Sequence, residues 1–271
     1  MSARVLLADS VTRLTEAHAG QVVVSGSHGG RIAAAYVARA AVRAAAFNDA
    51  GRGLDDAGVS GLPELDRAGI AAVAVAHTSA RIGDAADTLA SGIVSACNMP
   101  AADCGVREGM ACREAMDCLR DARWNRGTVT MPAETRVTLV AAAAGQVAAV
   151  GLDSIGIVTG EDAGRVLVIA SHGALHGGDP ASALPVAARA AIFHDAGRGK
   201  EDAGVSRLPV LAARGMPAAA VDFRTARIGD ARSLWASGVV SVANAPAHRA
   251  GVVPGMRVED AVRVLLRSAW V

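Results

Sequence analysis

Histidine and aspartate residues recur at the ends of apolar runs, an arrangement suited to general acid–base chemistry. The phrase FNDAGRGLDDAGVS at 47–60 returns as FHDAGRGKEDAGVS at 193–206, and each copy has an aspartate, Asp49 or Asp195, where the apolar run stops. Histidine titrates closest to neutral pH, and a carboxylate can orient it as a general base. The repeated phrase therefore predicts a site made of histidine and aspartate.

The second copy carries more titratable side chains than the first. The additions are His176 and Asp179 in an inserted loop over 174–180, His194 in place of Asn48, and Lys200 in place of Leu54. We therefore predict that catalysis belongs to the second half, with His172 as the general base and Asp195 orienting it. Two sites, or one site shared between the halves, are the alternatives. The base would activate a water molecule or Ser171. The predicted catalytic residues are His172, Asp195, His194 and Ser171.

Further polar residues follow the same apolar runs and are predicted to bind substrate. Backbone N–H groups of the SGSHGG stretch at 25–30 could hold an anion, because the stretch follows a predicted strand and precedes a predicted helix. Arginine could bind a carboxylate or carbonyl oxygen, or could pair with the aspartate three residues later. The predicted binding residues are Ser27, His28, Asp49, Arg81, Arg227, Lys200, Asn98 and Asn244.

A divalent metal is the alternative to a general base. His172, His176, His194 and an aspartate could hold an ion that lowers the pKa of bound water. No H-E-x-x-H or comparable motif occurs in the chain. We therefore expect no cofactor and favour the metal-free mechanism.

The whole chain reads as two copies of one unit. Ser27-His28-Gly29 matches Ser171-His172-Gly173 at an offset of 144, and Asp49 matches Asp195 at an offset of 146 because of the inserted loop. The predicted domains are an N-terminal repeat at 1–121, a connector at 122–134 and a C-terminal repeat at 135–271. Two similar halves commonly pack about a pseudo-twofold axis, as the subunits of a homodimer do.

Within each unit, short apolar runs alternate with helical patterns. Nearly continuous apolar strands separated by helices indicate a parallel sheet covered on both faces. The helices of the first unit are expected at 31–43, 57–68, 81–92 and 107–121, and one of the second at 183–191. The fold class predicted is α/β, with two tandem-duplicated parallel-sheet halves that are doubly wound and Rossmann-like. Ligands of such sheets bind at the carboxyl ends of the strands, where the predicted site residues fall.

Composition excludes several classes of function. Formal net charge is +1 and charges of both signs are mixed, so nucleic acid is not an expected partner. The apolar runs are shorter than the roughly 18 residues that a membrane span needs, and we expect no membrane partner. The N-terminus has no signal-peptide pattern, which favours a cytoplasmic protein. Alanine-rich helices with few aromatic residues leave flat apolar faces, and we expect a homo-oligomer.

These observations favour a hydrolase of a small polar substrate, such as an amide or cyclic amide. Backbone N–H groups and arginine would stabilise the anion that forms during the reaction. One alternative is a non-catalytic small-molecule binding protein. Another comes from Ala96-Cys97-Asn98, which is similar to the Cys-Asn loop of aspartate/glutamate racemases. That resemblance implies a racemase-like isomerase or a decarboxylase using Cys97. The matching position in the second half is Ala243, so the second cysteine of the racemase pair is missing.

Overall fold

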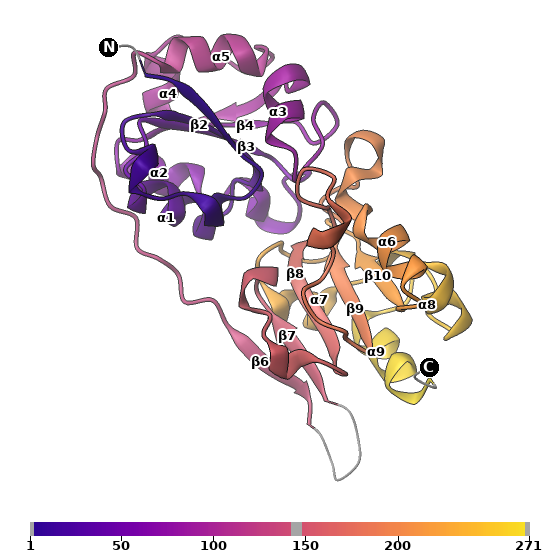
Figure 1. Cartoon of the computed structure of the whole chain (residues 1–271). Helices are drawn as coiled ribbons and strands as arrows, with labels where there is room; N and C mark the ends of the chain where they lie inside the picture. Colours follow the sequence, from indigo (N-terminus) through magenta and orange to yellow (C-terminus); the bar gives the residue numbers. More distant parts are fainter. Residues whose placement is uncertain (1–2, 142–147, 269–271) are drawn as a thin grey trace.

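The computed structural model describes residues 3–141 and 148–268 of the chain. It has an α/β fold in two halves, each built around a mixed sheet whose strands are mostly parallel (Figure 1). The first half contributes a five-stranded sheet and the second a six-stranded sheet among the described residues. The α/β class and the predominance of parallel pairing are therefore as the sequence predicts.

The first half runs from β1 to α5. Its strands and α-helices are β1 (Val5–Ala8), β2 (Val22–His28), α1 (Arg31–Arg39), β3 (Ala44–Asn48), α2 (Leu62–Arg67), β4 (Ala71–Val75), α3 (Ala85–Ser91), β5 (Val94–Cys97), α4 (Met99–Asp103) and α5 (Cys112–Leu119). Its 3-10 turns are η1 (Val11–Arg13), η2 (Glu16–His18) and η3 (Leu54–Val59). The strand order is β1-β2-β3-β4-β5, and β1 to β4 are parallel.

The second half follows an irregular connector. Its strands and α-helices are β6 (Arg136–Val140), β7 (Ala149–Leu152), β8 (Val166–His172), β9 (Ala190–His194), α6 (Arg207–Ala213), β10 (Ala218–Val221), α7 (Ala231–Ser237), β11 (Val240–Ala243), α8 (Ala245–Arg249) and α9 (Val258–Arg267). Its 3-10 turns are η4 (Ile155–Ile157), η5 (Gly160–Asp162), η6 (Pro180–Ser182) and η7 (Lys200–Val205). The strand order is β11-β10-β9-β8-β7-β6, and β7 to β10 are parallel.

Alanine and valine fill both faces of each sheet. Side chains of a strand alternate between faces, so Val23 joins the core under α1 and α2, while Val22 and Val24 join the core under α5. Figure 1 shows α1 and α2 on one side of the first sheet and α3, α4 and α5 on the other. The larger core side chains include Phe47 and Phe193, both fully buried at matching places in β3 and β9. Small side chains elsewhere let the helices lie close to the sheets.

The prediction of a doubly wound sheet is wrong, because the strand order in each half never reverses direction. Successive right-handed crossovers in one direction put their helices on the same face, as α1 and α2 are. The other face is covered by helices that follow β4. In addition, β5 pairs antiparallel with β4, and β11 with β10. The chain leaves β4 or β10 at its carboxyl end, passes through α3 or α7, and begins the next strand at that same end of the sheet. A short apolar run does not reveal the direction of its strand.

The helix predicted at 183–191 is also absent from the described structure. That segment is irregular until β9 begins at Ala190, and Pro185 within it has no N–H for a helical hydrogen bond. The buried side chain of Arg207 lies in this region and donates to the carbonyl oxygens of Ser182 and Ala183. The matching residue of the first half is Gly61, where a Cβ would lie 2.5 Å from the Gly30 oxygen. The first half needs glycine there because α1 packs against it.

The two halves contact each other through matched loops after β3 and β9. A small apolar cluster joins them, made of Ala50, Ala57, Ile82, Ala174, Ala196, Ala203 and Ile228. Among the backbone hydrogen bonds that cross the contact, two are matched, from Leu54 N–H to Phe223 O at 2.9 Å and from Lys200 N–H to His77 O at 2.8 Å. Since 54 and 200 are matched positions, as are 77 and 223, each half makes the same bond to the other.

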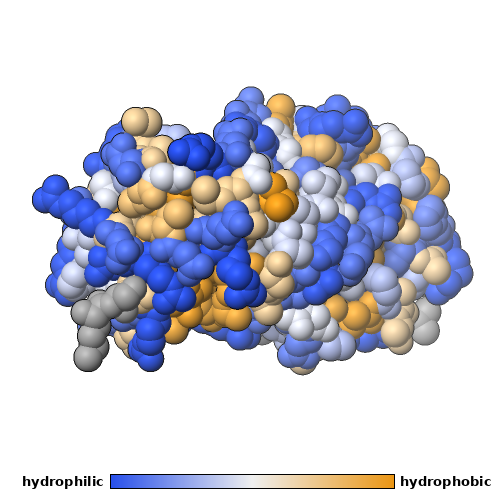
Figure 2. Space-filling model, turned by 90° about the horizontal axis from the view of Figure 1, so that it is seen from above, coloured by the Kyte–Doolittle hydropathy of each residue, from blue (hydrophilic) through white to orange (hydrophobic). Residues whose placement is uncertain are grey.

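No helix in the described part of the chain is long and apolar enough to cross a membrane. Figure 2, which views the molecule from above, shows hydrophilic residues over much of that face, with hydrophobic residues in interrupted patches.

Candidate functional site

A cavity lies where the two halves meet and is lined by the strand ends of both. It has two adjoining parts of about 320 and 140 Å³, and both parts are lined by His28, Ile32, Asp153 and Gly229. We refer to the two parts together as the His28 cavity. The predicted site residues Ser27, Ser171 and His172 also line it, together with Arg227. The structure thus brings residues from both halves to one place.

His28 and His172 hold matching hydrogen bonds that fix their tautomers. The ring Nδ1 of His28 accepts from Gly30 N–H at 3.1 Å, and Nδ1 of His172 accepts from Ala174 N–H at 3.3 Å. A neutral imidazole whose Nδ1 accepts must carry its proton on Nε2. The buried side-chain nitrogen and oxygen atoms without a partner in the described structure belong to Arg207. The Nε2–H groups of both histidines make no hydrogen bond to described residues and are not among these enclosed atoms, so each keeps some exposed surface, and both residues line the cavity.

Burial keeps these histidines uncharged. It lowers the pKa of His28 to about 4, helped by the nearby ring of His194. Burial and the neighbouring His176 hold the pKa of His172 well below its ordinary value. Burial also lowers the pKa of His176, whose ring lies 5.9 Å from that of His172, to about 4. At neutral pH the cavity therefore holds neutral imidazoles that donate through Nε2, which is the opposite of the general-base role predicted for His172.

Ser27 and Ser171 brace the chain beside the cavity. The Oγ atom of Ser27 accepts from Val11 N–H at 3.1 Å, and Oγ of Ser171 accepts from Ile155 N–H at 2.9 Å. These bonds tie the end of β2 to η1 and the end of β8 to η4. A serine nucleophile needs a base at its hydroxyl, and no histidine bonds to Ser171 within the described structure.

His194 is the structural equivalent of Asn48. Its Nδ1 accepts from Ala196 N–H at 3.0 Å, and its Nε2 lies 3.1 Å from the oxygen of Ala226. Asn48 makes the same pair of bonds, accepting from Ala50 N–H at 2.9 Å and donating to Ala80 O at 3.0 Å. Both ring nitrogens of His194 are thus engaged, and burial lowers its pKa to about 4. The catalytic role predicted for His194 has no free nitrogen to support it.

The predicted pairing of His172 with Asp195 is not formed in the described structure. Asp195 Oδ1 instead accepts from Gly197 N–H at 2.9 Å and Phe223 N–H at 3.0 Å. The cause is the alternation of side chains along a strand. His172 lies beside His194 on the neighbouring strand, and Asp195, the next residue after His194, projects to the opposite side. Burial raises the pKa of Asp195 above its ordinary value, in spite of these hydrogen bonds.

Asp49 has the same backbone contacts and a histidine in addition. Its Oδ1 accepts from Gly51 N–H at 2.9 Å and lies 2.9 Å from His77 Nδ1, and its Oδ2 accepts from Ser95 Oγ at 2.8 Å. Burial acts to raise the pKa of Asp49, but the bonds from His77, Gly51 and Ser95 bring it below its ordinary value. A histidine–aspartate pair thus exists in the first half, between residues that follow β3 and β4, and Phe223 takes the place of the histidine in the second half.

The predicted arginines form ion pairs across the contact between the halves. Arg81 bonds to Asp84 at 3.0 Å and to Glu201 of the other half at 2.9 Å. Arg227 has the matching contacts, to Asp230 at 3.1 Å and to Asp55 at 2.8 Å. Lys200 also crosses the contact, reaching Asp87 at 2.7 Å and Ser91 at 2.9 Å. Of these three predicted binding residues, Arg227 lines the His28 cavity.

Asn98 and Asn244 lie at the opposite edge of their sheets from the other predicted residues. Asn98 follows β5 and Asn244 follows β11. Because these strands run antiparallel to their neighbours, their carboxyl ends lie beside the amino ends of the parallel strands. Asn98 Oδ1 accepts from Ala72 N–H at 2.9 Å and caps α4, and Asn244 Oδ1 accepts from Ala218 N–H at 2.9 Å and caps α8. The structure thus places both asparagines apart from the other predicted site residues, because the sequence does not show that β5 and β11 reverse.

Sequence reasoning also missed residues of the cavity. The first turn of α1 faces it, and Gly30 provides no side-chain cap. The hydrogen bond from Ala34 N–H to Gly30 O opens the helix, which leaves the N–H groups of its first three residues without a partner in the described structure. Glu134, from the connector, lines the cavity as well and makes no hydrogen bond or ion pair with described residues. The SGSHGG stretch signalled the helix start, whereas nothing in the sequence signalled Glu134.

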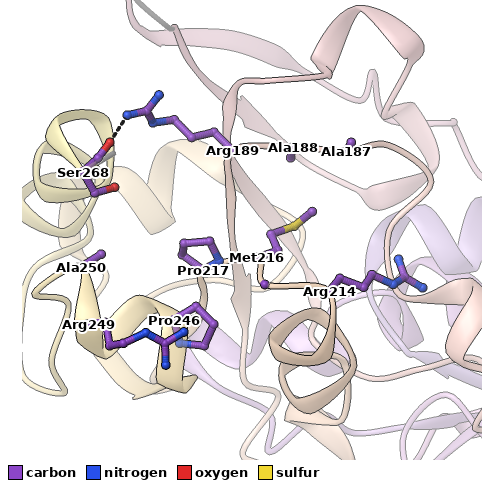
Figure 3. Close-up of a pocket in the computed structure, with 11 residues that line it drawn as sticks. Ala187, Ala188, Arg189, Arg214, Met216, Pro217, Pro246, Arg249, Ala250 and Ser268 are labelled. Carbon is purple, nitrogen blue, oxygen red and sulfur yellow. Dashed lines mark hydrogen bonds between the residues drawn. The ribbon is translucent and has the colours of Figure 1, made fainter. Parts of the chain in front are cut away.

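A separate cavity of about 560 Å³ lies at the other edge of the second sheet, lined by Arg189, Arg214 and Arg249 (Figure 3). In Figure 3 Arg189 reaches to Ser268, to whose backbone oxygen it donates, while Arg214 points in another direction. Arg214 donates to the Pro180 oxygen at 2.8 Å. Its arginines do not converge on one point, so we place the candidate site in the His28 cavity.

The described residues include no cluster of three or more His, Cys, Asp or Glu side chains arranged to hold a metal ion. In the metal set predicted from the sequence, His194 has both ring nitrogens in hydrogen bonds.

The chain was compared with protein-family models, with curated proteins and with solved structures. No family model matches it, and neither does any curated protein or solved structure.

Proposed function

We propose that the chain is a hydrolase of a small polar amide that binds in the His28 cavity. The carbonyl oxygen of the substrate would lie at the Nε2–H groups of His28 and His172, near the unpaired N–H groups at the start of α1. Preorganised donors of this kind stabilise the negative charge that develops on oxygen as the carbonyl is attacked. The observation that carries the proposal is the pair of neutral histidines, one from each half, which line one cavity and whose Nε2–H groups make no hydrogen bond to described residues.

Glu134 is the residue we assign as general base. It lines the same cavity and has no bonded partner among the described residues. Its carboxylate would take a proton from the attacking water, and the carbon–nitrogen bond would break as that proton passes to the leaving nitrogen. A histidine base is disfavoured because Nδ1 of both His28 and His172 is already an acceptor.

The alternatives have different support. A racemase-like isomerase or decarboxylase would need a reactive thiolate at Cys97, but burial and the nearby Glu108 raise the pKa of that thiol. A non-catalytic binding protein is the second candidate, because hydrogen-bond donors that hold an oxygen are useful without turnover. What separates it from the hydrolase is the carboxylate of Glu134 in the cavity.

The test is the hydrolysis of a panel of small amides, including cyclic amides and N-acetylated dipeptides. The amine that is released measures the reaction. We expect turnover in the parent and a loss of at least a hundredfold in Glu134→Gln, with the exposed Glu161→Gln as the matched control. Binding without turnover in the parent would favour the binding protein instead.

We also infer that the two halves are tandem-duplicated copies related by a pseudo-twofold axis. The sequence offsets support this, as do the paired hydrogen bonds at Ser27 and Ser171 and the reciprocal bonds to Phe223 and His77. The axis would pass between the loops after β3 and β9. A single site between the copies then follows from the duplication, because each copy contributes one histidine.

A homo-oligomer in the cytoplasm remains our proposal for the state of the protein. Exposed Leu7 on the edge strand β1 and exposed Met99 and Val253 favour self-association. Cys97, Cys104, Cys112 and Cys118 are free thiols, which is typical of a reducing compartment. Light scattering at micromolar concentration measures the mass, and a value equal to one chain would reject the oligomer.

A further inference from the structure

The loop inserted into the second half fills a space that is open in the first. A Cβ built on Gly83 would lie 2.2 Å from the backbone oxygen of Leu175, which belongs to this loop. A Cβ built on the matched Gly229 would meet just one side chain within 4 Å, His28, at 4.0 Å. Gly229 lines the His28 cavity. The cavity therefore has a counterpart beside Gly83, and the chain itself occupies that counterpart.

The occupant is held by its backbone. Leu175 N–H donates to Ser206 Oγ at 2.9 Å, and Gly177 N–H donates to Gly83 O at 2.7 Å. The segment is therefore held as a bound peptide is, through main-chain N–H donors two residues apart, with the Leu175 oxygen lying against Gly83.

The open cavity keeps the groups that make these bonds. Ser60 matches Ser206 and lines the cavity; its hydroxyl donates to Ala57 O at 2.9 Å, and its oxygen accepts no hydrogen bond from described residues. Gly229 matches Gly83, and its carbonyl oxygen accepts no hydrogen bond from described residues. Both glycines also donate to β-strand carbonyls in the same way, Gly83 to Gly26 O at 2.7 Å and Gly229 to Ala170 O at 2.9 Å. The two walls are thus alike, and one lacks its peptide.

We propose that the His28 cavity binds an extended peptide-like segment, whose N–H groups donate to Ser60 Oγ and to the carbonyl oxygen of Gly229. This inference rests on the proposed function and names its substrate class as peptide-like amides. The segment 174–177 serves as the internal copy of the ligand. Charged side chains also line the cavity and would interact with a charged end of a short peptide. They are Arg31, Asp55, Arg227 and Asp230.

The probe is the capped tetrapeptide N-acetyl-Ala-Leu-His-Gly-amide, the sequence of 174–177. It is titrated into the full chain and followed by calorimetry and by amide chemical shifts. We expect shifts centred on Ser60 and Gly229, and binding about tenfold weaker in Ser60→Ala because one hydrogen bond is lost. The matched control is Ser206→Ala, which removes the equivalent hydroxyl on the occupied side and is expected to leave the affinity within twofold.

Chemical shifts in the parent protein need no variant, so a misfolded Ser60→Ala does not spoil the test. Shifts absent from Ser60 and Gly229 at millimolar peptide would overturn the inference, and so would equal affinity in Ser60→Ala and the parent. The hydrolase proposal fails separately. Peptide binding at Ser60 without cleavage of any amide keeps the ligand class and rejects hydrolysis, whereas cleavage of other amides without peptide binding does the reverse.

Discussion

Asn48 and His194 stand at matching ends of β3 and β9 and make the same two hydrogen bonds, one from a backbone N–H two residues ahead and one to a carbonyl in the loop after the next strand. An amide and a neutral imidazole present an acceptor and a donor at similar positions. The histidine that looked most like added chemistry is therefore a structural substitute for asparagine.

This equivalence predicts the outcome of exchanging the side chains. His194→Asn is expected to change the free energy of unfolding by less than about 1 kcal/mol, because both bonds can be remade. His194→Leu is expected to cost about 2 to 4 kcal/mol, since it strands a buried N–H and a buried carbonyl. Denaturant unfolding of the two variants checks this, and equal losses in both would contradict it.

The buried histidines predict a loss of stability in mild acid. From an ordinary value near 6.5, the pKa values of His28, His176 and His194 are lowered to about 4, and burial holds the pKa of His172 well below its ordinary value. Below pH 6.5 the unfolded chain binds protons that the folded chain does not, so stability is full above that pH and decreases as the pH falls toward 4. Each histidine contributes up to about 1.4 kcal/mol per pH unit.

Unfolding free energies measured between pH 7.5 and 4.5 test this slope. The variant His194→Asn is expected to have a shallower slope, by the share of one histidine. A stability that does not change between pH 6.5 and 5 would show that these rings are not held neutral.

The pair of Asp49 and His77 predicts a reciprocal pKa change. His77→Phe removes a hydrogen bond to the carboxylate and is expected to raise the pKa of Asp49, toward the behaviour of Asp195. Phe223→His should lower the pKa of Asp195 for the same reason. Carbon-13 titration of the two carboxyl groups by NMR measures both, and an unchanged Asp49 in His77→Phe would contradict the role given to the histidine.

Lys200 and Asp87 predict a coupled pair across the contact between the halves. The matched residues in the other orientation are Leu54 and Ser233. Lys200→Leu alone leaves the buried carboxylate of Asp87 without its ammonium partner at 2.7 Å and is expected to cost about 2 to 3 kcal/mol. Adding Asp87→Ser should recover most of that loss. Two additive losses in a double-mutant cycle would mean that the two residues are not coupled.

The sequence predicted the α/β class and most strands, and it placed Ser27 with His28, and Ser171 with His172, at a strand end of each half. It did not predict that these two strand ends, which belong to different sheets, would line one cavity. It did not predict that β5 and β11 run antiparallel, since an apolar run has no direction, and so it misplaced Asn98. It joined His172 to Asp195, although His172 lies beside His194, and Asp195, the next residue of the chain, projects to the opposite side.

The sequence also did not show which half contains the open cavity. The inserted loop with His176 suggested a richer site in the second half. In the structure the backbone of that loop occupies the space beside Gly83, and the open cavity lies beside His28. The types of side chain in a loop do not reveal which space its backbone will occupy. Glu134 was missed for another reason, because it reaches the cavity from a connector that resembles neither repeat.

The central claim is that His28 acts as a neutral N–H donor in the cavity between the halves, and replacing it with glutamine tests this most directly. Glutamine can donate an N–H from a similar position but cannot act as a base, whereas alanine can do neither. On the amide cleaved fastest by the parent, we expect His28→Gln to retain activity within about tenfold and His28→Ala to lose about a hundredfold or more. The exposed His248→Ala is the control and should be fully active. Equal inactivity of the glutamine and alanine variants would contradict the donor role, and full activity of both would remove His28 from the site.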